Sequence, residues 1–190
     1  MAITKLSERT VLEIAEHEGL VLETYVDSVG VETWSFGITD ASGHKVDRYR
    51  DNPSTVERAI EVYEWLLRTK YLPDVLRAFE GVKLNEHQLA GALSFHWNTG
   101  AILRASWVKS FVAGKRGKAF REFMNWSKPR EIIGRRKAER ALFFNDVWTS
   151  DGHVTLWQRV HSNGTPDWSS GKQIDIRDAL RAALAKGDPA

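Results

Sequence analysis

Apolar residues recur every three or four positions over most of the chain, a pattern that predicts a mainly helical protein. The first such stripe follows Ser7, a good helix-capping residue, and runs through Val11 and Ile14 to Glu18. Glu18 is therefore expected on the apolar face of this helix, with Gly19 ending it as a left-handed cap. A carboxyl group among apolar neighbours holds its proton more tightly, as a general acid must.

The pattern changes to extended structure after this helix. Residues 20–26 and 29–34 are rich in β-branched and aromatic residues and are separated by turn residues, so they predict a β-hairpin. If the hairpin folds about Gly30, Asp27 and Thr33 lie opposite one another on one face. An acid, a second carboxylate and a hydroxyl would then share one short segment.

The middle of the chain predicts more helices. A short edge strand is expected at 44–46, and a Ser54/Glu57 capping box then opens a long helix at about 54–68. Beyond it, one helix should start near Pro73 and another at an Asn85/Gln88 capping box. Gly and Pro residues separate three more helices, at 106–113, 118–125 and 135–147.

The last forty residues shift to shorter elements. Extended pieces are expected at 154–160 and 174–176, and a final helix at 177–186 has apolar residues that must pack on something. We therefore expect residues 150–190 to form an ordered C-terminal extension packed on the domain formed by residues 1–149. The predicted fold class is α+β, mostly helical with a small sheet.

Composition excludes several classes of protein. The 190 residues contain no cysteine, which excludes disulfides, thiolate metal sites and a cysteine nucleophile. No run approaches the roughly 20 apolar residues of a membrane span, and the first eight residues lack the apolar stretch of a signal peptide. We expect a soluble protein that cannot export itself by a visible signal.

Charge is unevenly distributed along the chain. Residues 104–140 hold 12 Lys and Arg against 3 Asp and Glu, although the whole chain has a formal net charge of only +2. This basic region could attract an anionic polymer or an anionic membrane surface, or it could be a set of solvated helix faces. No nucleic-acid-binding motif accompanies it, so nucleic acid is not an expected partner.

Four blocks of sequence resemble the phage-type lysozymes, glycoside hydrolase family 24. The first is the spacing of Glu18, Asp27 and Thr33. The others are the run from Pro53 to Ile60, the block from Gln88 to Gly100 that contains Phe-x-x-Asn-x-Gly, and the Gly-Arg-Arg-Lys-Ala-Glu block at 134–139. Two positions depart from the family pattern, because Ser35 stands at a usual glycine and Ile38 at a frequent histidine.

The resemblance implies a lysozyme-like fold and a muramidase activity. A small N-terminal lobe with the hairpin (about 8–52) would be joined by the long helix to a helical lobe (about 71–149). The substrate would be the peptidoglycan glycan strand, cut at the β-1,4 bond between N-acetylmuramic acid and N-acetylglucosamine. The protein would act as a monomer, reaching the wall after holin-type release or on a virion.

The resemblance also implies roles for particular residues. Glu18 would be the proton donor, while Asp27 and Thr33 would handle the attacking water. Arg136, or else Arg135, would approach the catalytic glutamate and fix its geometry, and Asn98 would bind a substrate acetamido group or cap its helix. The histidines show no zinc-ligand spacing, and we expect neither a metal nor a cofactor.

Two other functions remain open at this point. A lysozyme-like fold can serve as a peptidoglycan-binding protein without catalysis, because fold does not fix function. A basic helix from the 104–140 region could instead disrupt membranes. Chitin-like polymers are possible secondary substrates, and the tail tryptophans Trp157 and Trp168 could pack or bind glycan.

Overall fold

The computed structural model describes residues 6–186, so the predicted features of residues 1–5 and 187–190 lie outside the described part. The chain divides into two compact units. Within the described residues, the sheet unit comprises residues 15–66 and 150–186, and the helical unit comprises residues 6–14 and 67–149. The predicted α+β class is confirmed, with helices predominating over one small sheet.

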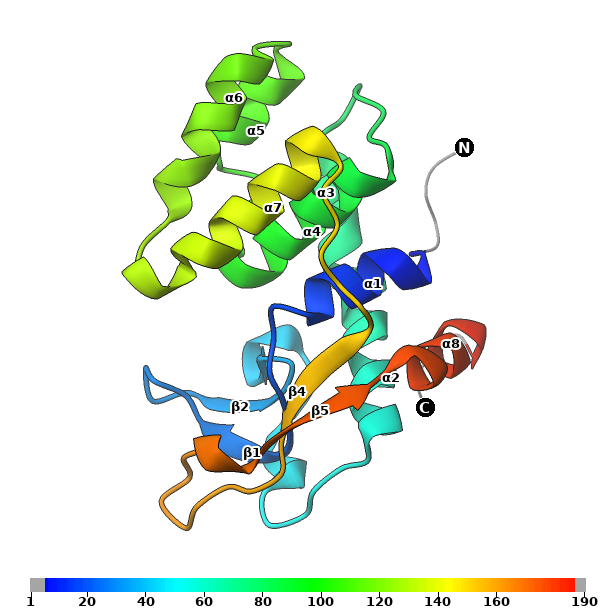
Figure 1. Cartoon of the computed structure of the whole chain (residues 1–190), viewed down its shortest axis with the longest axis vertical. Coiled ribbons are helices and arrows are strands. Elements are labelled where there is room, and N and C mark those ends of the chain that lie inside the picture. The colour runs from blue at the N-terminus through cyan, green and yellow to red at the C-terminus, as the bar shows by residue number, and fades with distance from the viewer. Residues whose placement is uncertain (1–5, 187–190) are drawn as a thin grey trace. The chain divides into compact units, whose positions relative to one another are not determined.

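The sheet unit is organised around the predicted hairpin. Its five strands stand in the order β3-β2-β1-β4-β5 (Figure 1). β1 pairs antiparallel with β2, and it pairs in parallel with β4, a strand of the C-terminal extension. The strands are β1 (Leu20–Val26), β2 (Glu32–Ser35), β3 (Ile38–Thr39), β4 (His153–Trp157) and β5 (Gly171–Asp175). The extension therefore supplies two strands of the sheet that carries the hairpin.

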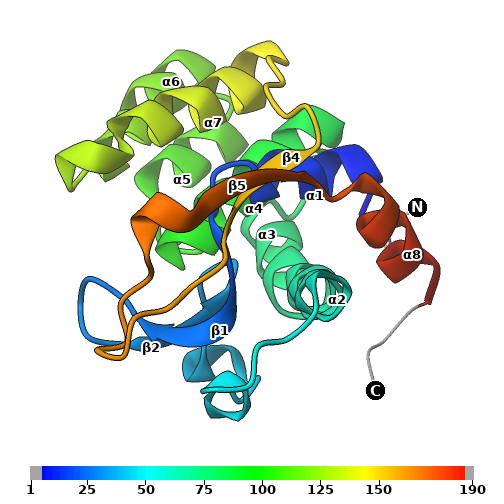
Figure 2. The same cartoon turned by 60° about the horizontal axis from the view of Figure 1, so that its bottom comes forward.

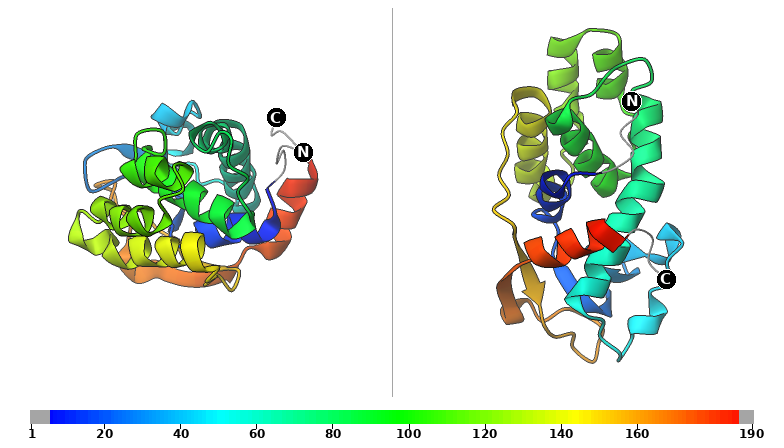
Figure 3. Two further views of the ribbon diagram at one scale, coloured as in Figure 1. Left: turned by 90° about the horizontal axis from the view of Figure 1, so that it is seen from above. Right: turned by 90° about the vertical axis from the view of Figure 1, so that its right-hand side faces the viewer.

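Two helices complete the sheet unit. α2 (Val56–Leu66) packs against α8 (Arg177–Lys186), as Figures 1, 2 and 3 all show. α8 has the predicted bounds and buries Leu180, while Lys186 Nζ lies 2.6 Å from Glu61 Oε1. The capping residue of α2 is Thr55, whose hydroxyl accepts the Arg58 amide at 3.1 Å, and not the predicted Ser54.

The predicted edge strand at 44–46 is absent from the described structure, and β3 at Ile38–Thr39 takes its place. The Asp40 side chain explains the difference. Its Oδ1 accepts the backbone amide of Val46 at 2.9 Å, so this amide is not available to a strand ladder. The preceding residues, Asp40–Ser42, form a 3-10 turn that ends at Gly43 in the left-handed region, with φ 91°.

The helical unit consists of α1 and five further helices. They are α1 (Glu8–Ala15), α3 (Leu72–Ala78), α4 (Glu86–Thr99), α5 (Ser106–Val112), α6 (Arg116–Phe123) and α7 (Ile133–Asn145). A π-helical turn at Leu67–Tyr71 precedes α3. α4 packs along α7 and α5 along α6 (Figure 1). Among the described residues, no helix has the length and apolar character needed to cross a lipid bilayer.

The caps of α1 and α4 follow the sequence prediction. Ser7 Oγ accepts the Thr10 amide at 3.1 Å. At the start of α4, Asn85 and Gln88 exchange side-chain and backbone hydrogen bonds of 3.0 and 3.1 Å. α4 ends at Gly100, whose φ of 60° few other residues adopt without strain.

Aromatic rings form the core of the helical unit. Phe95, Trp107, Phe123 and Phe143 are fully buried and pack edge-to-face or tilted, with ring centroids 4.6 to 6.5 Å apart. A Cβ on Gly91 would lie 2.9 Å from Cβ of Phe143, closer than real contacts allow. The close approach of α4 to α7 thus requires glycine at this position.

We predict that acid destabilises the sheet unit through His44. The ring is buried, stacks on Trp34 and places Nε2 3.0 Å from the Tyr49 hydroxyl. Burial first, and then the positive charges of Arg48 and Arg58, lower the pKa of His44 from 6.5 to about 4. The neutral ring is the form that stabilises the folded state. Its contribution is complete above pH 6.5 and is lost as the pH falls toward 4.

The melting temperature measured between pH 7 and pH 4 checks this expectation. His44→Asn removes the titrating group, so its melting temperature should fall less steeply with acid than that of the parent. His161→Asn, at an exposed position, is the matched control and should follow the parent. Parallel curves for His44→Asn and the parent would exclude His44 as the source of acid sensitivity.

Candidate active site

The proposed acid, Glu18, lies beyond its predicted helix. α1 ends at Ala15, and the Glu18 amide donates to the Ala15 carbonyl at 2.9 Å as the chain turns toward β1. The prediction that Glu18 continues the apolar stripe of the helix is therefore wrong. The side chain is half-buried, and its Oε2 lies 3.8 Å from where a Cβ on Gly37 would stand. The carboxylate thus faces the turn between β2 and β3.

Gly19 is required by a close contact and not by a left-handed cap. Its φ lies outside the left-handed region. A Cβ at this position would stand 1.6 Å from Cζ3 of Trp157, inside the indole ring. Trp157 reaches it because β4 pairs in parallel with β1, which places Trp157 opposite Val21. The helix has to end before Gly19, since the backbone passes against a ring from the extension.

Asp27 fixes the turn of the hairpin with its own side chain. Oδ1 accepts the Val29 amide at 2.9 Å and the Val31 amide at 2.8 Å. The Asp27 amide in turn donates to the Val31 carbonyl at 3.0 Å. The carboxylate is half-buried, and Oδ2 has no hydrogen bond to any of the residues that the structure describes. Oδ1 is thus committed to the turn, and Oδ2 is left for water or a ligand.

Thr33 lies opposite Tyr25, which corrects the predicted register. The loop closes between Asp27 and Val31, because the Asp27 carboxylate binds both amides of the turn; the hairpin is therefore centred on Val29 and not on Gly30. The Thr33 hydroxyl is buried and donates to the Val31 carbonyl at 3.1 Å. Asp27 and Thr33 are brought together through Val31, which binds one side chain with its amide and the other with its carbonyl.

Tyr25 is a site residue that the sequence reasoning missed. Its pKa is raised above the usual 10.0, first by burial and then by the negative charges of Glu18 and Asp27. Both carboxylates therefore lie within electrostatic reach of one hydroxyl, which stands opposite Thr33. The sequence could have indicated this residue, because Tyr25 lies two positions before Asp27 and alternate residues of a strand point to the same face of the sheet.

Arg136 lies at the centre of a buried polar cluster in the helical unit. Its guanidinium is fully buried and donates to the Glu139 carboxylate, to Asn98 Oδ1 and, at 3.1 Å, to the Trp126 carbonyl. Burial lowers the pKa of Arg136, and the Glu139 charge opposes this shift. Arg135 Nε also binds Glu139, at 2.8 Å. Whether Arg136 positions the catalytic glutamate remains a prediction.

Asn98 does not cap its helix, since Gly100 performs that role. Its side chain is exposed, and Arg136 holds its Oδ1, so the amide NH₂ is oriented and available as a donor. It lines a cavity of about 340 Å³ in the helical unit together with Trp126 and Lys128. Trp126 is half-buried, and so is Trp97.

Several arginines of the basic region, residues 104–140, make structural contacts within the helical unit. Arg116 donates to the Phe144 carbonyl, while Arg104 and Arg140 lie over the rings of Trp126 and Phe120. Exposed lysines and arginines remain, among them Lys109, Lys115, Arg121, Lys128 and Arg130. Within residues 6–186, no three His, Cys, Asp or Glu side chains gather as a metal ion would require.

Comparison with known proteins identifies the family. The family model for phage lysozyme matches residues 15–139. The chain belongs to the phage lysozyme family. The resemblance stated from the sequence is thereby confirmed, and family membership makes the protein a peptidoglycan-hydrolysing lysozyme, a glycoside hydrolase that acts on the bacterial cell wall. No curated protein sequence gives a significant match.

Solved structures of phage lysozymes and a related muramidase share the fold. A crystal structure of a P22 lysozyme mutant is 25% identical, covers 75% of this chain and 100% of its own, and has a TM-score of 0.62. The endolysin from Escherichia coli O157:H7 phage FAHEc1 is 22% identical, with coverages of 78% and 99% and a TM-score of 0.62. The muramidase domain of SpmX from Asticaccaulis excentricus is 23% identical, with 74% and 98% covered and a TM-score of 0.58.

Ser35 stands at a position where phage lysozymes usually have glycine, and the structure shows how serine is accommodated there. The residue has φ 56°, in the left-handed region where glycine is favoured. It is fully buried, and its hydroxyl donates to the Ala59 carbonyl of α2 at 3.4 Å. The backbone geometry expected of glycine is retained, and the short polar side chain finds a partner.

We predict that the Arg136 cluster stabilises the helical unit. Arg136→Met should lower the free energy of unfolding by about 3–5 kcal/mol, because the Glu139 carboxylate would stay buried without its closest cation. Urea unfolding measures this change. Lys137→Met, on the exposed neighbouring position, is the control and should change stability by less than about 0.5 kcal/mol. Equal effects of the two substitutions would contradict a stabilising role for the cluster.

Proposed function

We propose that the protein hydrolyses the β-1,4 bond between N-acetylmuramic acid and N-acetylglucosamine, with Glu18 as proton donor and Asp27 and Thr33 as the groups that hold the attacking water. The observation that carries the proposal is the arrangement around Val31 and Tyr25. Val31 is hydrogen-bonded to both Asp27 and Thr33. The negative charges of Glu18 and Asp27 both raise the pKa of the Tyr25 hydroxyl. The influence of both carboxylates on one tyrosine of the sheet unit supports the proposal.

Glycoside hydrolysis needs one carboxyl group to protonate the leaving oxygen and a second to act at the anomeric carbon. Glu18 suits the first role. It is half-buried on an irregular bend and faces the backbone at Gly37, where a φ of 84° favours glycine. A sugar oxygen reaching this bend would meet the carboxyl group directly.

Asp27 and Thr33 suit the second role together. Oδ1 of Asp27 is held by two backbone amides, which fixes the plane of the carboxylate and presents Oδ2 as a proton acceptor. The Thr33 hydroxyl donates to Val31 and keeps its lone pairs to accept a hydrogen from water. A water bound between Asp27 and Thr33 would donate one hydrogen bond to Oδ2 of Asp27 and one to the Thr33 hydroxyl oxygen. Its lone pair would then point toward the sugar.

Asn98 and Arg136 are proposed to support substrate binding. Arg136 holds Asn98 Oδ1, so the Asn98 NH₂ is oriented to donate to the carbonyl of an acetamido group. Arg136 is itself fixed by Glu139 and by the Trp126 carbonyl. Its proposed part is therefore to position a neighbouring side chain and not to touch the reacting atoms.

We predict that Glu18→Gln lowers peptidoglycan hydrolysis by at least about 100-fold while the fold is kept, because glutamine has the same shape but no acidic proton. Release of reducing ends from purified sacculi measures the rate. Asp27→Asn should give a similar loss of activity, because an amide cannot take a proton from the attacking water. The hairpin should be kept, since the amide oxygen of asparagine can still accept the two turn amides.

Glu57→Gln is the matched control, at an exposed position of α2 distant in sequence from the hairpin. It should retain the parent rate. If Glu18→Gln clears permeabilised bacteria as fast as the parent, lysis by glycan-independent membrane disruption would replace the enzymatic proposal. Binding of sacculi without cleavage by the parent would indicate a catalytically silent binding protein.

We further predict that the reaction inverts the anomeric configuration. In that route a water attacks directly, and the two carboxyl groups stand about 6.5–9.5 Å apart. The tie between Asp27 and Thr33 through Val31 favours this route, because it builds a place for water and not for a covalent bond to Asp27. NMR of a short glycan early in the reaction should show the α-anomer first, and β-anomer as the first product would contradict the prediction.

A further inference from the structure

The C-terminal extension places two tryptophans next to the segment that carries Glu18. The ring of Trp157 lies against Gly19, where a Cβ would stand 1.6 Å from Cζ3. Trp168 stands perpendicular to Trp157, with ring centroids 4.9 Å apart and an interplanar angle of 90°. These residues form a chain of contacts that leads from the neighbour of Glu18 to the surface.

Trp168 is exposed to an unusual degree for a tryptophan. It is 62% exposed, and it is the one aromatic residue among the large apolar side chains that the described chain exposes. Single exposed aliphatic residues need no explanation, but an indole buries more apolar surface than any other side chain when it finds a partner. Its exposure here leaves a broad apolar face unpaired.

Hydrogen bonds on both sides of Trp168 fix the turn that carries it. Trp168 opens the 3-10 helix Trp168–Ser170, which Asp167 caps by accepting the Ser169 amide at 3.0 Å. Arg159 binds the same carboxylate through Nε and Nη2, at 3.0 and 2.7 Å. Ser170 Oγ accepts the Gln158 amide at 3.1 Å. A side chain presented from an ordered turn requires no ordering of the backbone when it binds a ligand.

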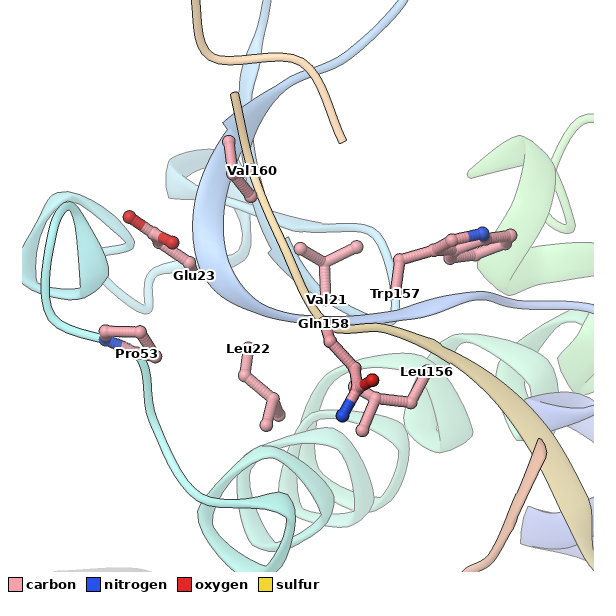
Figure 4. Close-up of a pocket in the computed structure, with 8 residues that line it drawn as sticks. All are labelled: Val21, Leu22, Glu23, Pro53, Leu156, Trp157, Gln158 and Val160. Carbon is pink, nitrogen blue, oxygen red and sulfur yellow. The ribbon is translucent and has the colours of Figure 1, made fainter. Parts of the chain in front are cut away.

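Polar groups lie on the other side of Trp157. The ring forms one wall of a hollow of about 140 Å³ between β1 and the segment that follows β4 (Figure 4). The Glu23 carboxylate and the Gln158 amide also line this hollow, with Pro53 beside Glu23. Trp168 is not among the residues that line this hollow, so its exposed indole is a separate surface.

We propose that Trp157 and Trp168 form an additional glycan-binding subsite, contributed by the extension, for a sugar of the peptidoglycan strand beyond the cleaved bond. Trp168 would stack on the C–H face of the sugar ring, and Trp157 would support its indole from behind. The glycan is the favoured occupant because the subsite adjoins the segment of the proposed acid. The inference thus rests on the proposed function, and the matched family region ends at residue 139, before either tryptophan.

Binding measured without cleavage tests this subsite. In the Glu18→Gln background, titration calorimetry with N-acetylchitohexaose and sedimentation with purified sacculi should show about fivefold weaker binding for Trp168→Ala. Trp168→Phe, which keeps an aromatic face, should retain most of the affinity. In the enzyme with Glu18 intact, Trp168→Ala should raise KM by a similar factor with a much smaller change in kcat.

Lys172→Ala provides the control, because Lys172 is exposed on β5 of the same extension. Its affinity should equal that of the parent. Unchanged binding by Trp168→Ala, or equal weakening by Lys172→Ala, would overturn the proposal. Failure of the catalytic proposal is distinguished by a separate measurement, because it would appear as release of reducing ends by Glu18→Gln itself.

Discussion

Two hydrogen bonds from backbone amides to Oδ1 of Asp27 set the geometry of the proposed active site. A hydrogen bond to a charged carboxylate contributes about 1.5–3 kcal/mol, enough to choose one hairpin register over another. With Asp27 bound to the amides of Val29 and Val31, the strands pair so that Thr33 lies opposite Tyr25. The same residue that is proposed to handle water therefore also folds the turn that presents it.

The helical unit uses a different device to fix polar groups. Arg136 and Glu139 are both fully buried, and each has several partners. Placing two charges in an apolar core among Phe95 and Phe143 is costly unless every donor and acceptor is satisfied. As a result the side chain of Asn98, which lies on the surface, is oriented by a guanidinium that is itself held by several partners.

The extension belongs to the sheet unit both by pairing and by packing. β4 continues the sheet beside β1, α8 covers α2, and Trp157 takes the space above Gly19. Gly164 extends this link, since its carbonyl accepts the Val26 amide at 2.7 Å just before Asp27. The extension thus contacts β1 at both ends, next to Glu18 and next to Asp27, and its removal would expose the backbone that carries both carboxylates.

The sequence by itself determined the elements whose causes are local. The caps at Ser7, Asn85 and Gly100, the existence of the hairpin and the bounds of the last helix all depend on residues a few positions apart. The motif spacing also identified the family. Only the tertiary structure decided the need for glycine at position 19, because the indole that occupies the space beside it comes from the far end of the chain. The register of Thr33 has a local cause, since Asp27 binds amides two and four residues further on, but this contact leaves no periodic signal from which the register could be predicted.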